Sequence, residues 1–212
     1  MEADFWHNKW HKNEIGFHLD SPNPLLLKYF NYISLETGHR IFLPLCGKTL
    51  DIKWLLTQGY RVAGAELSQV AIDDLFRNLE LDPKITKIGQ LTHYSANNID
   101  VYVGDIFNLP RDLLGTVDAI YDRAALVALP NNMRSQYSKL LLEITDNAPQ
   151  LLVCFEYDQS LHVGPPFSIH ADEIKQHYQH AYDITLLGSH EVEGGLKGKC
   201  QATEHVWCLK SK

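Results

Sequence analysis

Short runs of apolar residues alternate along this chain with longer segments in which apolar residues recur at every third or fourth position. The short runs predict strands at residues 40–45, 60–67, 99–103, 117–121 and 151–157. The amphipathic segments predict helices at residues 49–58, 70–79, 133–144 and 171–178. Strands that alternate with helices predict an α/β fold, in which helices cover both faces of a mostly parallel sheet.

Individual residues mark the ends of several of these elements. Gly59 follows the first helical segment, where glycine typically ends a helix, and Ser68 stands where an N-cap belongs before residues 70–79. Residues 184–192 and 204–209 are separated mainly by turn-forming residues. We therefore expect these two segments to form a closing antiparallel pair of strands.

The length and composition of the chain narrow the classes of protein to which it can belong. Its 212 residues predict a single domain over residues 1–212, and 45% hydrophobic with 21% charged residues is typical of a globular protein. The longest apolar run, residues 124–129, is too short for a membrane-spanning helix. The first residues lack the apolar core of a secretory signal, so we expect a cytoplasmic location.

The charged and metal-binding residue types also argue against several functions. The formal net charge is −7 and no basic stripe is present, so nucleic acid is not an expected partner. The four cysteines are scattered without a Cys-x-x-Cys motif, which favours free thiols in a reducing compartment. His7 and His11 have the spacing of zinc ligands on a helix, but Asn8 stands where a zinc protease has its catalytic glutamate. We therefore expect no metal.

In sheets of this kind ligands bind where the strands end, so the candidate residues are those that directly follow the predicted strands. They are Leu45, Cys46, Gly47, Glu66, Asp105, Asp122 and Arg123.

Glu66 carries the clearest chemical signal, because it ends the second predicted strand 20 residues after Cys46. A carboxylate in that place accepts hydrogen bonds from both hydroxyls of a ribose, although a solvated glutamate is the simpler alternative. Gly47-Lys48-Thr49 is similar to the end of a P-loop, but Phe42 stands where that loop needs glycine. No G-x-G-x-x-G motif follows the strand either, which favours a nucleoside without a pyrophosphate.

The other candidates leave two interpretations each. Asp105 contacts an adenine ring or only forms a turn. Arg123 binds an anionic group of a ligand or forms a surface ion pair. Trp6, Trp10 and Phe17 precede the first strand, and they either cover a cofactor against water or pack as a helix on the sheet.

Several longer motifs occur in order along the chain. They are Trp6-x3-Trp10-x6-Phe17-His18, Leu43-Pro44-Leu45-Cys46-Gly47-Lys48-x-x-Asp51, Gly64-x-Glu66-Leu67-Ser68, Asp105-Ile106-Phe107-x-Leu109-Pro110, Asp122-Arg123-x-Ala125-Leu126-Val127-Ala128 and Gly164-Pro165-Pro166-Phe167. Together these motifs resemble the thiopurine S-methyltransferase family of the bacterial type.

The resemblance implies a Rossmann-like class I methyltransferase fold, with a seven-stranded mixed sheet and helices on both faces. It implies S-adenosyl-L-methionine as cofactor and S-adenosyl-L-homocysteine as product, with residues 1–35 as a helical cover over the cofactor cleft. The implied cofactor contacts are Trp10, Leu45, Glu66 and Arg123, with Asp105 and Ile106 near the adenine. Phe17 matches the aromatic residue that faces the substrate.

The implied reaction is methyl transfer to the sulfur of an aromatic or heterocyclic thiol by a monomer. We expect Arg123 to stabilise the thiolate anion, and no general base is assigned. Methylation of selenium or tellurium oxyanions, or of their reduced forms, is an alternative reaction. Nucleoside binding without catalysis is the alternative outside enzymes. Residues 164–167 are expected to shape a lid over the pocket for a small molecule.

Overall fold

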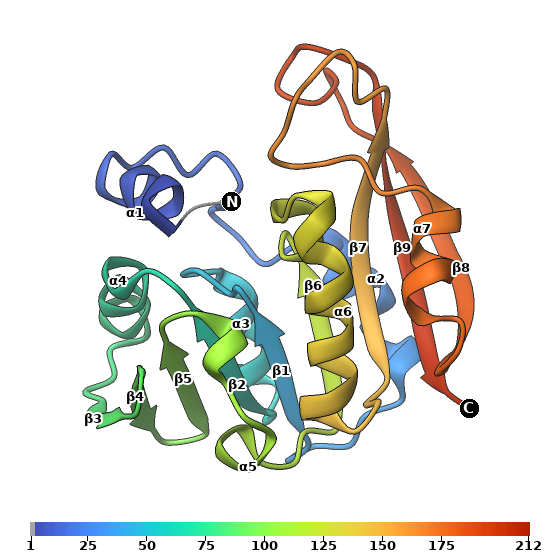
Figure 1. Ribbon diagram of the computed structural model, residues 1–212. Helices are drawn as coiled ribbons and strands as arrows, with labels where there is room; N and C mark the ends of the chain where they lie inside the picture. Colours follow the sequence, from blue (N-terminus) through green and yellow to red (C-terminus); the bar gives the residue numbers. More distant parts are fainter. Residues whose placement is uncertain (1–2) are drawn as a thin grey trace.

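Nine strands form one continuous sheet in the computed structural model of the protein, which describes residues 3–212 (Figure 1). They are β1 (Arg40–Pro44), β2 (Arg61–Glu66), β3 (Lys84–Ile88), β4 (Leu91–Ala96), β5 (Ile99–Val103), β6 (Ala119–Arg123), β7 (Gln150–Tyr157), β8 (Tyr182–Glu191) and β9 (Ala202–Ser211). Their order across the sheet is β3-β4-β5-β2-β1-β6-β7-β9-β8. The strands predicted from the apolar runs are β1, β2, β5, β6 and β7, and all of them form.

The centre of the sheet is parallel, as predicted. β5, β2, β1, β6 and β7 run in one direction as neighbours, so their carboxyl ends lie at the same edge of the sheet. β9 pairs antiparallel with both β7 and β8. The predicted closing antiparallel pair is therefore confirmed, and it extends the sheet beyond β7.

The expected seven-stranded sheet is wrong in one respect, because β3 and β4 add a hairpin to the edge beside β5. β4 pairs antiparallel with β5 and β3 pairs antiparallel with β4. Most of β3 is exposed, so the strand has no apolar run of the kind that marked the others. The two residues between β3 and β4, Gly89 and Gln90, are the sequence signal for this hairpin, since glycine is typical of such short turns.

Helices cover the sheet on both faces. The α-helices are α1 (Ala3–His11), α2 (Pro24–Tyr29), α3 (Leu50–Thr57), α4 (Gln69–Leu79), α5 (Arg111–Leu114), α6 (Asn131–Thr145) and α7 (Ala171–Tyr178). Short 3-10 helices are η1 (Phe30–Ile33), η2 (Ile106–Asn108) and η3 (Leu126–Ala128). The four predicted helices correspond to α3, α4, α6 and α7. Within residues 3–212 no helix has the length and apolar character needed to cross a membrane.

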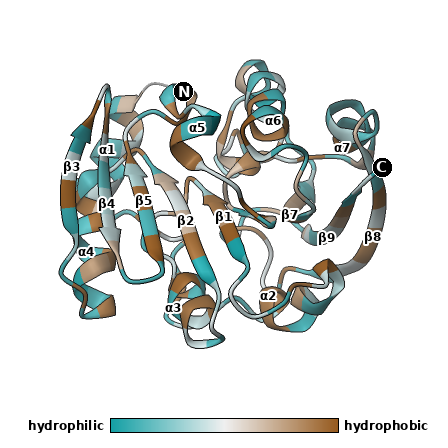
Figure 2. Cartoon of the chain, turned by 90° about the horizontal axis from the view of Figure 1, so that it is seen from below, coloured by the Kyte–Doolittle hydropathy of each residue, from teal (hydrophilic) through white to brown (hydrophobic). Residues whose placement is uncertain are grey.

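The alternation of side chains along the strands separates the core into two layers. Phe42 of β1 packs in the layer that faces α6 and α7, whereas its neighbours Ile41 and Leu43 pack in the layer that faces α2 and α3. Figure 2 shows α5, α6 and α7 on one side of the sheet and α2 and α3 on the other. Both faces of each central strand are therefore buried, which is why these strands read as continuous apolar runs.

The two helix-boundary residues act as predicted. The Ser68 hydroxyl accepts a hydrogen bond from the backbone N–H of Ala71 at 3.4 Å and so caps α4. Gly59 adopts a φ of 83° just after α3, a conformation that glycine tolerates best. Gly59 lies just before β2 and Ser68 just after it, so both residues help to place Glu66 at the end of the strand.

Candidate functional site

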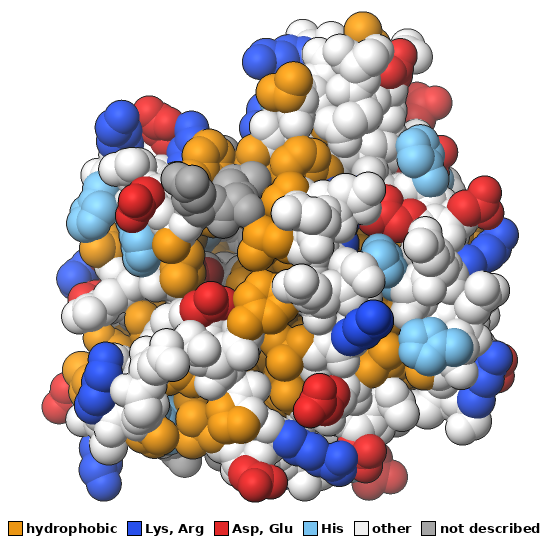
Figure 3. Space-filling view, in the orientation of Figure 1, with side chains coloured by type: hydrophobic (Ala, Val, Ile, Leu, Met, Phe, Trp, Pro, Cys, Tyr) orange, Lys and Arg blue, Asp and Glu red, His pale blue; other side chains and the backbone are white. Residues whose placement is uncertain are grey.

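The carboxyl ends of β1, β2 and β6 bring three of the predicted site residues to one edge of the sheet. Leu45 follows β1, Glu66 ends β2 and Arg123 ends β6. α1, which carries Trp10, lies above this edge in Figure 1. In Figure 3 hydrophobic side chains form a column down the middle of the same view, between the side that carries α1 and α4 and the side that carries α6.

The turn after β1 has an unusual backbone. Leu45 adopts a φ of 48° and Gly47 a φ of 53°, and the left-handed region is rare for a residue such as leucine. A Cβ atom placed on Gly47 would lie 2.9 Å from the ring of Trp10, so the turn and α1 touch at this point. Trp10 is buried by this packing. The glycine therefore allows both the turn and the close approach of an aromatic ring.

Glu66 is a buried carboxylate that faces this turn. One of its oxygens accepts a hydrogen bond from the backbone N–H of Gly47 at 2.8 Å, and the other accepts one from Ser68 at 2.9 Å. Burial raises the pKa of Glu66, and the backbone donors only partly offset that effect. Each carboxylate oxygen keeps a second lone pair, so the group still has acceptors for two ribose hydroxyls. The solvated glutamate considered from sequence is not what the structure shows, since Glu66 is 6% exposed.

Asp105 and Ile106 follow β5, farther along the same edge. The Asp105 side chain accepts a hydrogen bond from the backbone N–H of Phe107 at 3.0 Å and caps η2, so the turn-forming interpretation is confirmed. Its exposed position leaves room for a ligand as well. Ile106 is buried in the core layer that faces α6 and α7. A contact of either residue with adenine stays a prediction.

Arg123 joins the end of β6 to the N-terminal segment. Its guanidinium donates a hydrogen bond to the backbone carbonyl of Phe17 at 3.1 Å. The Phe17 ring packs edge-on against Trp6 and Trp10, with ring centroids 5.9 and 5.5 Å apart. The three aromatic residues and Arg123 thus form one cluster above the sheet edge. Of the two interpretations of Arg123, the surface ion pair is not what the structure shows, because the guanidinium binds the Phe17 carbonyl.

Asp122 does not belong to this cluster, although sequence placed it beside Arg123. Its carboxylate points to the other face of the sheet, where it accepts hydrogen bonds from Tyr137 Oη at 2.7 Å and Leu126 N at 3.1 Å. Burial raises its pKa to about 6. The next residue, Ala124, has a φ of 62°. Asp122 therefore anchors the strained turn that follows Arg123 rather than facing a ligand.

Two further titratable residues lie near Arg123 and were not identified from sequence as site residues. Burial, followed by the positive charge of Lys48, lowers the pKa of His18. Burial raises the pKa of Glu204, a residue of β9, and the Arg123 charge opposes that shift. Both residues interact electrostatically with Arg123, and only the folded chain brings them close to it.

The site also contains a buried thiol, and the other cysteines are buried too. All four cysteines within the described residues are free. Cys46 lies between Leu45 and Gly47, and its sulfur would be 2.9 Å from a Cβ atom placed on Gly64. Burial and the nearby Glu66 carboxylate raise the pKa of Cys46 well above its usual range.

A lobe formed by residues 158–170 and 192–201 rises from the ends of β7 and β9, at the top of Figure 1. The Tyr157 hydroxyl donates to the carbonyl of Pro166 at 2.6 Å, and Lys197 Nζ donates to the carbonyl of Pro165 at 2.7 Å. The backbone N–H of Phe167 donates to Val127 at 2.7 Å. These bonds tie residues 164–167 to the rest of the lobe and to η3. A lid role for these residues stays a prediction.

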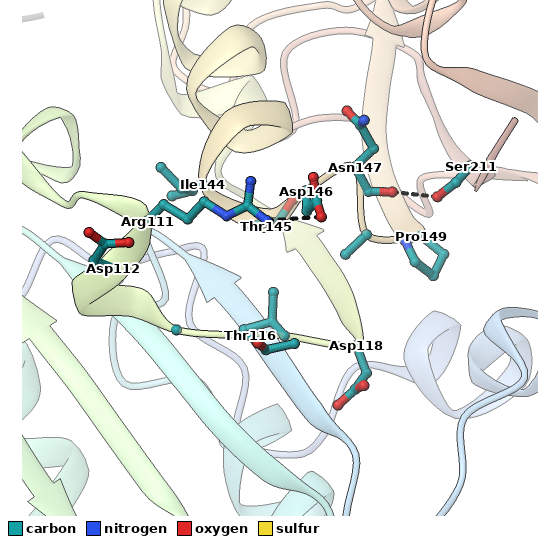
Figure 4. Close-up of a pocket in the computed structure, with 13 residues that line it drawn as sticks. Arg111, Asp112, Thr116, Asp118, Ile144, Thr145, Asp146, Asn147, Pro149 and Ser211 are labelled. Atoms are coloured by element: carbon teal, nitrogen blue, oxygen red, sulfur yellow. Dashed lines mark hydrogen bonds and ion pairs between the residues drawn. The ribbon is translucent and has the colours of Figure 1, made fainter.

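A hollow of about 530 Å³ lies at the opposite end of the sheet, where the parallel strands begin (Figure 4). Its walls include an ion pair of 2.9 Å between Arg111 and Asp146, and a hydrogen bond from the Ser211 hydroxyl to the Asn147 carbonyl. None of the predicted site residues lines it. Ligands of parallel α/β sheets bind at the carboxyl ends, so we place the functional site there despite this hollow.

Metal-binding side chains are not gathered anywhere in the part of the chain that the structure describes. Within residues 3–212 no three side chains of the types His, Cys, Asp or Glu are arranged to hold a metal ion. His7 and His11 lie on α1 and have no third partner of these types there.

Solved structures with the same architecture are S-adenosylmethionine-dependent methyltransferases. One from Anabaena variabilis matches with a TM-score of 0.67 and 14% identity, covering 99% of this chain and 95% of that one. A 1,6-didemethyltoxoflavin-N1-methyltransferase from Burkholderia thailandensis, solved with S-adenosylhomocysteine, matches with a TM-score of 0.68 and 13% identity, covering 99% and 87%. The fold is therefore that of a class I methyltransferase, with a nine-stranded sheet.

Sequence comparison narrows this class to one family. The thiopurine S-methyltransferase family model matches residues 1–212. The thiopurine S-methyltransferase of Xanthobacter autotrophicus is 52% identical over 211 residues, which cover 99% of both chains. That of Acinetobacter baylyi is 47% identical over 216 residues, which cover the whole of both chains. The chain belongs to the thiopurine S-methyltransferase family.

Proposed function

We propose that this protein transfers a methyl group from S-adenosyl-L-methionine to the sulfur of an aromatic or heterocyclic thiol. The observation that carries the proposal is the buried Glu66 carboxylate, held against the glycine turn after β1 in a member of this family. A carboxylate, a close backbone turn and an aromatic ring form a suitable site for an adenosine group. No G-x-G-x-x-G motif follows β1, which suits a cofactor without a pyrophosphate.

Each part of the cofactor has a proposed partner in the chain. Glu66 accepts hydrogen bonds from the ribose hydroxyls through its remaining lone pairs. Leu45 presents its backbone at the end of β1, and Trp10 covers that turn. Asp105 and Ile106 lie beyond β5, where the adenine would extend along the sheet edge. The cofactor supplies a methyl group bonded to a positively charged sulfur.

Arg123 is proposed to hold the acceptor. An ordinary thiol has a pKa of about 8.5, so only a few per cent is thiolate at neutral pH. A guanidinium nearby increases that fraction because it stabilises the anion. Alignment of the sulfur with the methyl carbon can supply roughly 7–11 kcal/mol of the barrier. Phe17, whose carbonyl binds Arg123, is proposed to contact the acceptor ring.

The proposed cover of the cofactor is narrower than the segment 1–35. α1 and Phe17 lie above the sheet edge, whereas α2 and η1 pack in the core layer against one face of the sheet. We therefore propose that the part of this segment before α2 excludes water from the methyl group. α2 and η1 support the sheet.

We further propose that the chain acts as a monomer on small molecules in a reducing compartment such as the cytoplasm. Free buried cysteines are typical of reducing conditions. A net charge of −7 favours a small-molecule acceptor over nucleic acid.

Thermal unfolding with and without S-adenosyl-L-homocysteine tests the cofactor. At a hundredfold excess over its dissociation constant a ligand adds about 2.7 kcal/mol to stability. For a chain of this length that raises Tm by roughly 5–11 °C. No shift at saturating ligand would refute the cofactor site. Binding without methyl transfer to any aromatic or heterocyclic thiol would instead indicate a nucleoside-binding protein, and transfer that selenite inhibits competitively would indicate a metalloid acceptor at the same site.

A further inference from the structure

Glu204 lies on the same face of the sheet as Arg123. Arg123 is the register partner of Val153 in β7, and Val153 is the register partner of Val206 in β9. Directly paired residues of neighbouring strands point to the same face, and so do residues two apart in one strand. Arg123, Val206 and Glu204 therefore share a face.

The strand pairing also sets how far apart Arg123 and Glu204 lie. Two strand spacings lie between β6 and β9, and neighbouring strands are about 4.8 Å apart. Glu204 is also displaced along β9 from the level of Arg123, toward the carboxyl end of β7. Both side chains are long, so their charged ends can approach one bound heterocycle from two sides.

Neighbouring residues partly shield the Glu204 carboxylate from water, but none of the described residues forms a hydrogen bond or ion pair with it. Its register partner in β7 is Phe155, and its partner in β8 is His190. His190 is engaged by the Tyr29 hydroxyl at 2.9 Å. Within the described residues no hydrogen bond or ion pair of the Glu204 carboxylate is formed, and Glu204 is only half-buried. A carboxylate that is partly desolvated, unpaired and reachable is available to a ligand.

We propose that Glu204 is a catalytic residue that accepts the ring N–H proton of a heterocyclic thione as the sulfur is methylated. This inference rests on the function proposed above and extends it to the acceptor. Many heterocyclic thiols carry their proton on a ring nitrogen next to the C=S group, and a guanidinium cannot accept that proton. Glu204 is the acid coupled to Arg123 from across the face, and it has the acceptor oxygens that Arg123 lacks.

The step balances without a further reactant. The electron pair of the N–H bond becomes the C=N bond, and the C=S π pair forms the new bond from sulfur to methyl. The sulfonium sulfur keeps the pair of the broken bond. The proton moves to a Glu204 oxygen and then to solvent. Burial raises the pKa of this carboxyl, which makes the ionised form a stronger base than an exposed glutamate.

Two acceptors separate this role from a structural one. Pyridine-2-thione carries its proton on the ring nitrogen, whereas 4-nitrobenzenethiol has no ring nitrogen and is ionised at neutral pH. Glu204→Gln keeps the shape of the side chain and removes the base. We expect kcat/KM for pyridine-2-thione to fall by about 100-fold or more, since general bases contribute roughly 100- to 10,000-fold. Activity on 4-nitrobenzenethiol should stay close to that of the wild type.

Glu156→Gln is the matched control, because Glu156 lies on a neighbouring strand and faces the opposite side, near His170 and His205. It should change neither activity. The dissociation constant of S-adenosyl-L-homocysteine should be the same for Glu204→Gln and the wild type.

An equal loss on both acceptors, or no loss on either, would overturn the role of Glu204. If Glu204→Gln fails to fold, Glu204→Asp serves instead. It keeps the charge but shortens the side chain by one methylene, and it should still lose more activity on pyridine-2-thione than on 4-nitrobenzenethiol. Equal effects of this variant on both acceptors would also overturn the role. A wild-type protein that binds S-adenosyl-L-homocysteine but methylates neither thiol would contradict the proposed function itself.

Discussion

The two ends of the parallel sheet differ in how their residues are held. At the carboxyl end, Glu66 and Asp122 are buried acids with raised pKa values, and Leu45 and Ala124 adopt left-handed backbone conformations. At the amino end, the hollow beside Arg111 measures about 530 Å³, within the range of roughly 300–1,000 Å³ typical of ligand pockets, but its ion pair is exposed.

Strained backbone and buried charge lower stability, so they persist where they serve a purpose. At the amino end Asp146 and Asn147 also have φ values of 56°, but Asp and Asn adopt the left-handed region more readily than Leu or Ala, and the Asp146 carboxylate is exposed rather than buried. Buried acids, together with strained backbone at Leu45 and Ala124, therefore locate the functional site better than the size of a hollow does.

The largest expected effect is the pH dependence that Asp122 gives to stability. Its pKa is about 6 in the folded chain against a usual 3.8, so the folded state binds the proton more tightly. The stability contributed by this group is therefore lost as pH rises through that window, by about 3 kcal/mol in total. Asp122→Asn removes the dependence. Urea unfolding at acidic and neutral pH should show wild-type stability declining relative to the variant, and parallel pH profiles would show that the buried acid carries no such cost.

Arg123→Ala should reduce kcat/KM for a thiol by about 100-fold, because misplacing or losing one group at the reacting sulfur has effects of that order. The free energy of unfolding should change far less, since the one hydrogen bond that Arg123 makes to Phe17 is only half-buried. Steady-state kinetics and urea unfolding of the same preparation measure both. Wild-type activity on a fully ionised thiol would show that Arg123 does not hold the anion.

Glu66→Gln should weaken the binding of S-adenosyl-L-homocysteine at least tenfold, since hydrogen bonds to a charged group are worth about 1.5–3 kcal/mol. The amide keeps one acceptor oxygen and replaces the other with a donor that faces the N–H of Gly47 or Ser68. Isothermal titration calorimetry gives the dissociation constant directly. An unchanged constant would remove Glu66 from the ribose.

Arg111→Ala, at the other end of the sheet, should have the smallest effect. Its ion pair with Asp146 is exposed on both sides, and such pairs are worth about 0–1 kcal/mol. Cofactor affinity and kcat/KM should both match the wild type. A loss of activity as large as that of Arg123→Ala would mean that the hollow in Figure 4 takes part in function, and the contrast between the two ends would no longer hold.

Sequence reasoning found the strands that are buried on both sides, and it found the edge pair of β8 and β9 from the turn-forming residues between them. β1, β2, β5, β6 and β7 lie between two helical layers, so their apolar runs stand out. β3 does not, because it is an exposed edge strand whose pairing depends on a two-residue turn. The expected number of strands was wrong for this reason.

The site was predictable for residues that end the parallel strands and point to the face of the ligand edge. Glu66 and Arg123 end strands of the parallel centre, and the rule for such sheets places both at one edge. Asp122 was assigned to the same edge, but adjacent residues of a strand face opposite sides, so it meets α6 instead. Glu204 reaches this edge through β9, which pairs with β7 over a distance in sequence that no local pattern reveals.

The burial of Cys46 has a consequence for the protein as a chemical reagent. A chain that presents an activated methyl group to sulfur carries its own sulfur next to the turn after β1. Only the thiolate is a strong nucleophile, and burial with the Glu66 charge keeps Cys46 as the neutral thiol. Burial, aided by the carboxylate proposed to hold the ribose, thus keeps the chain's own sulfur in its unreactive form beside the proposed methyl donor.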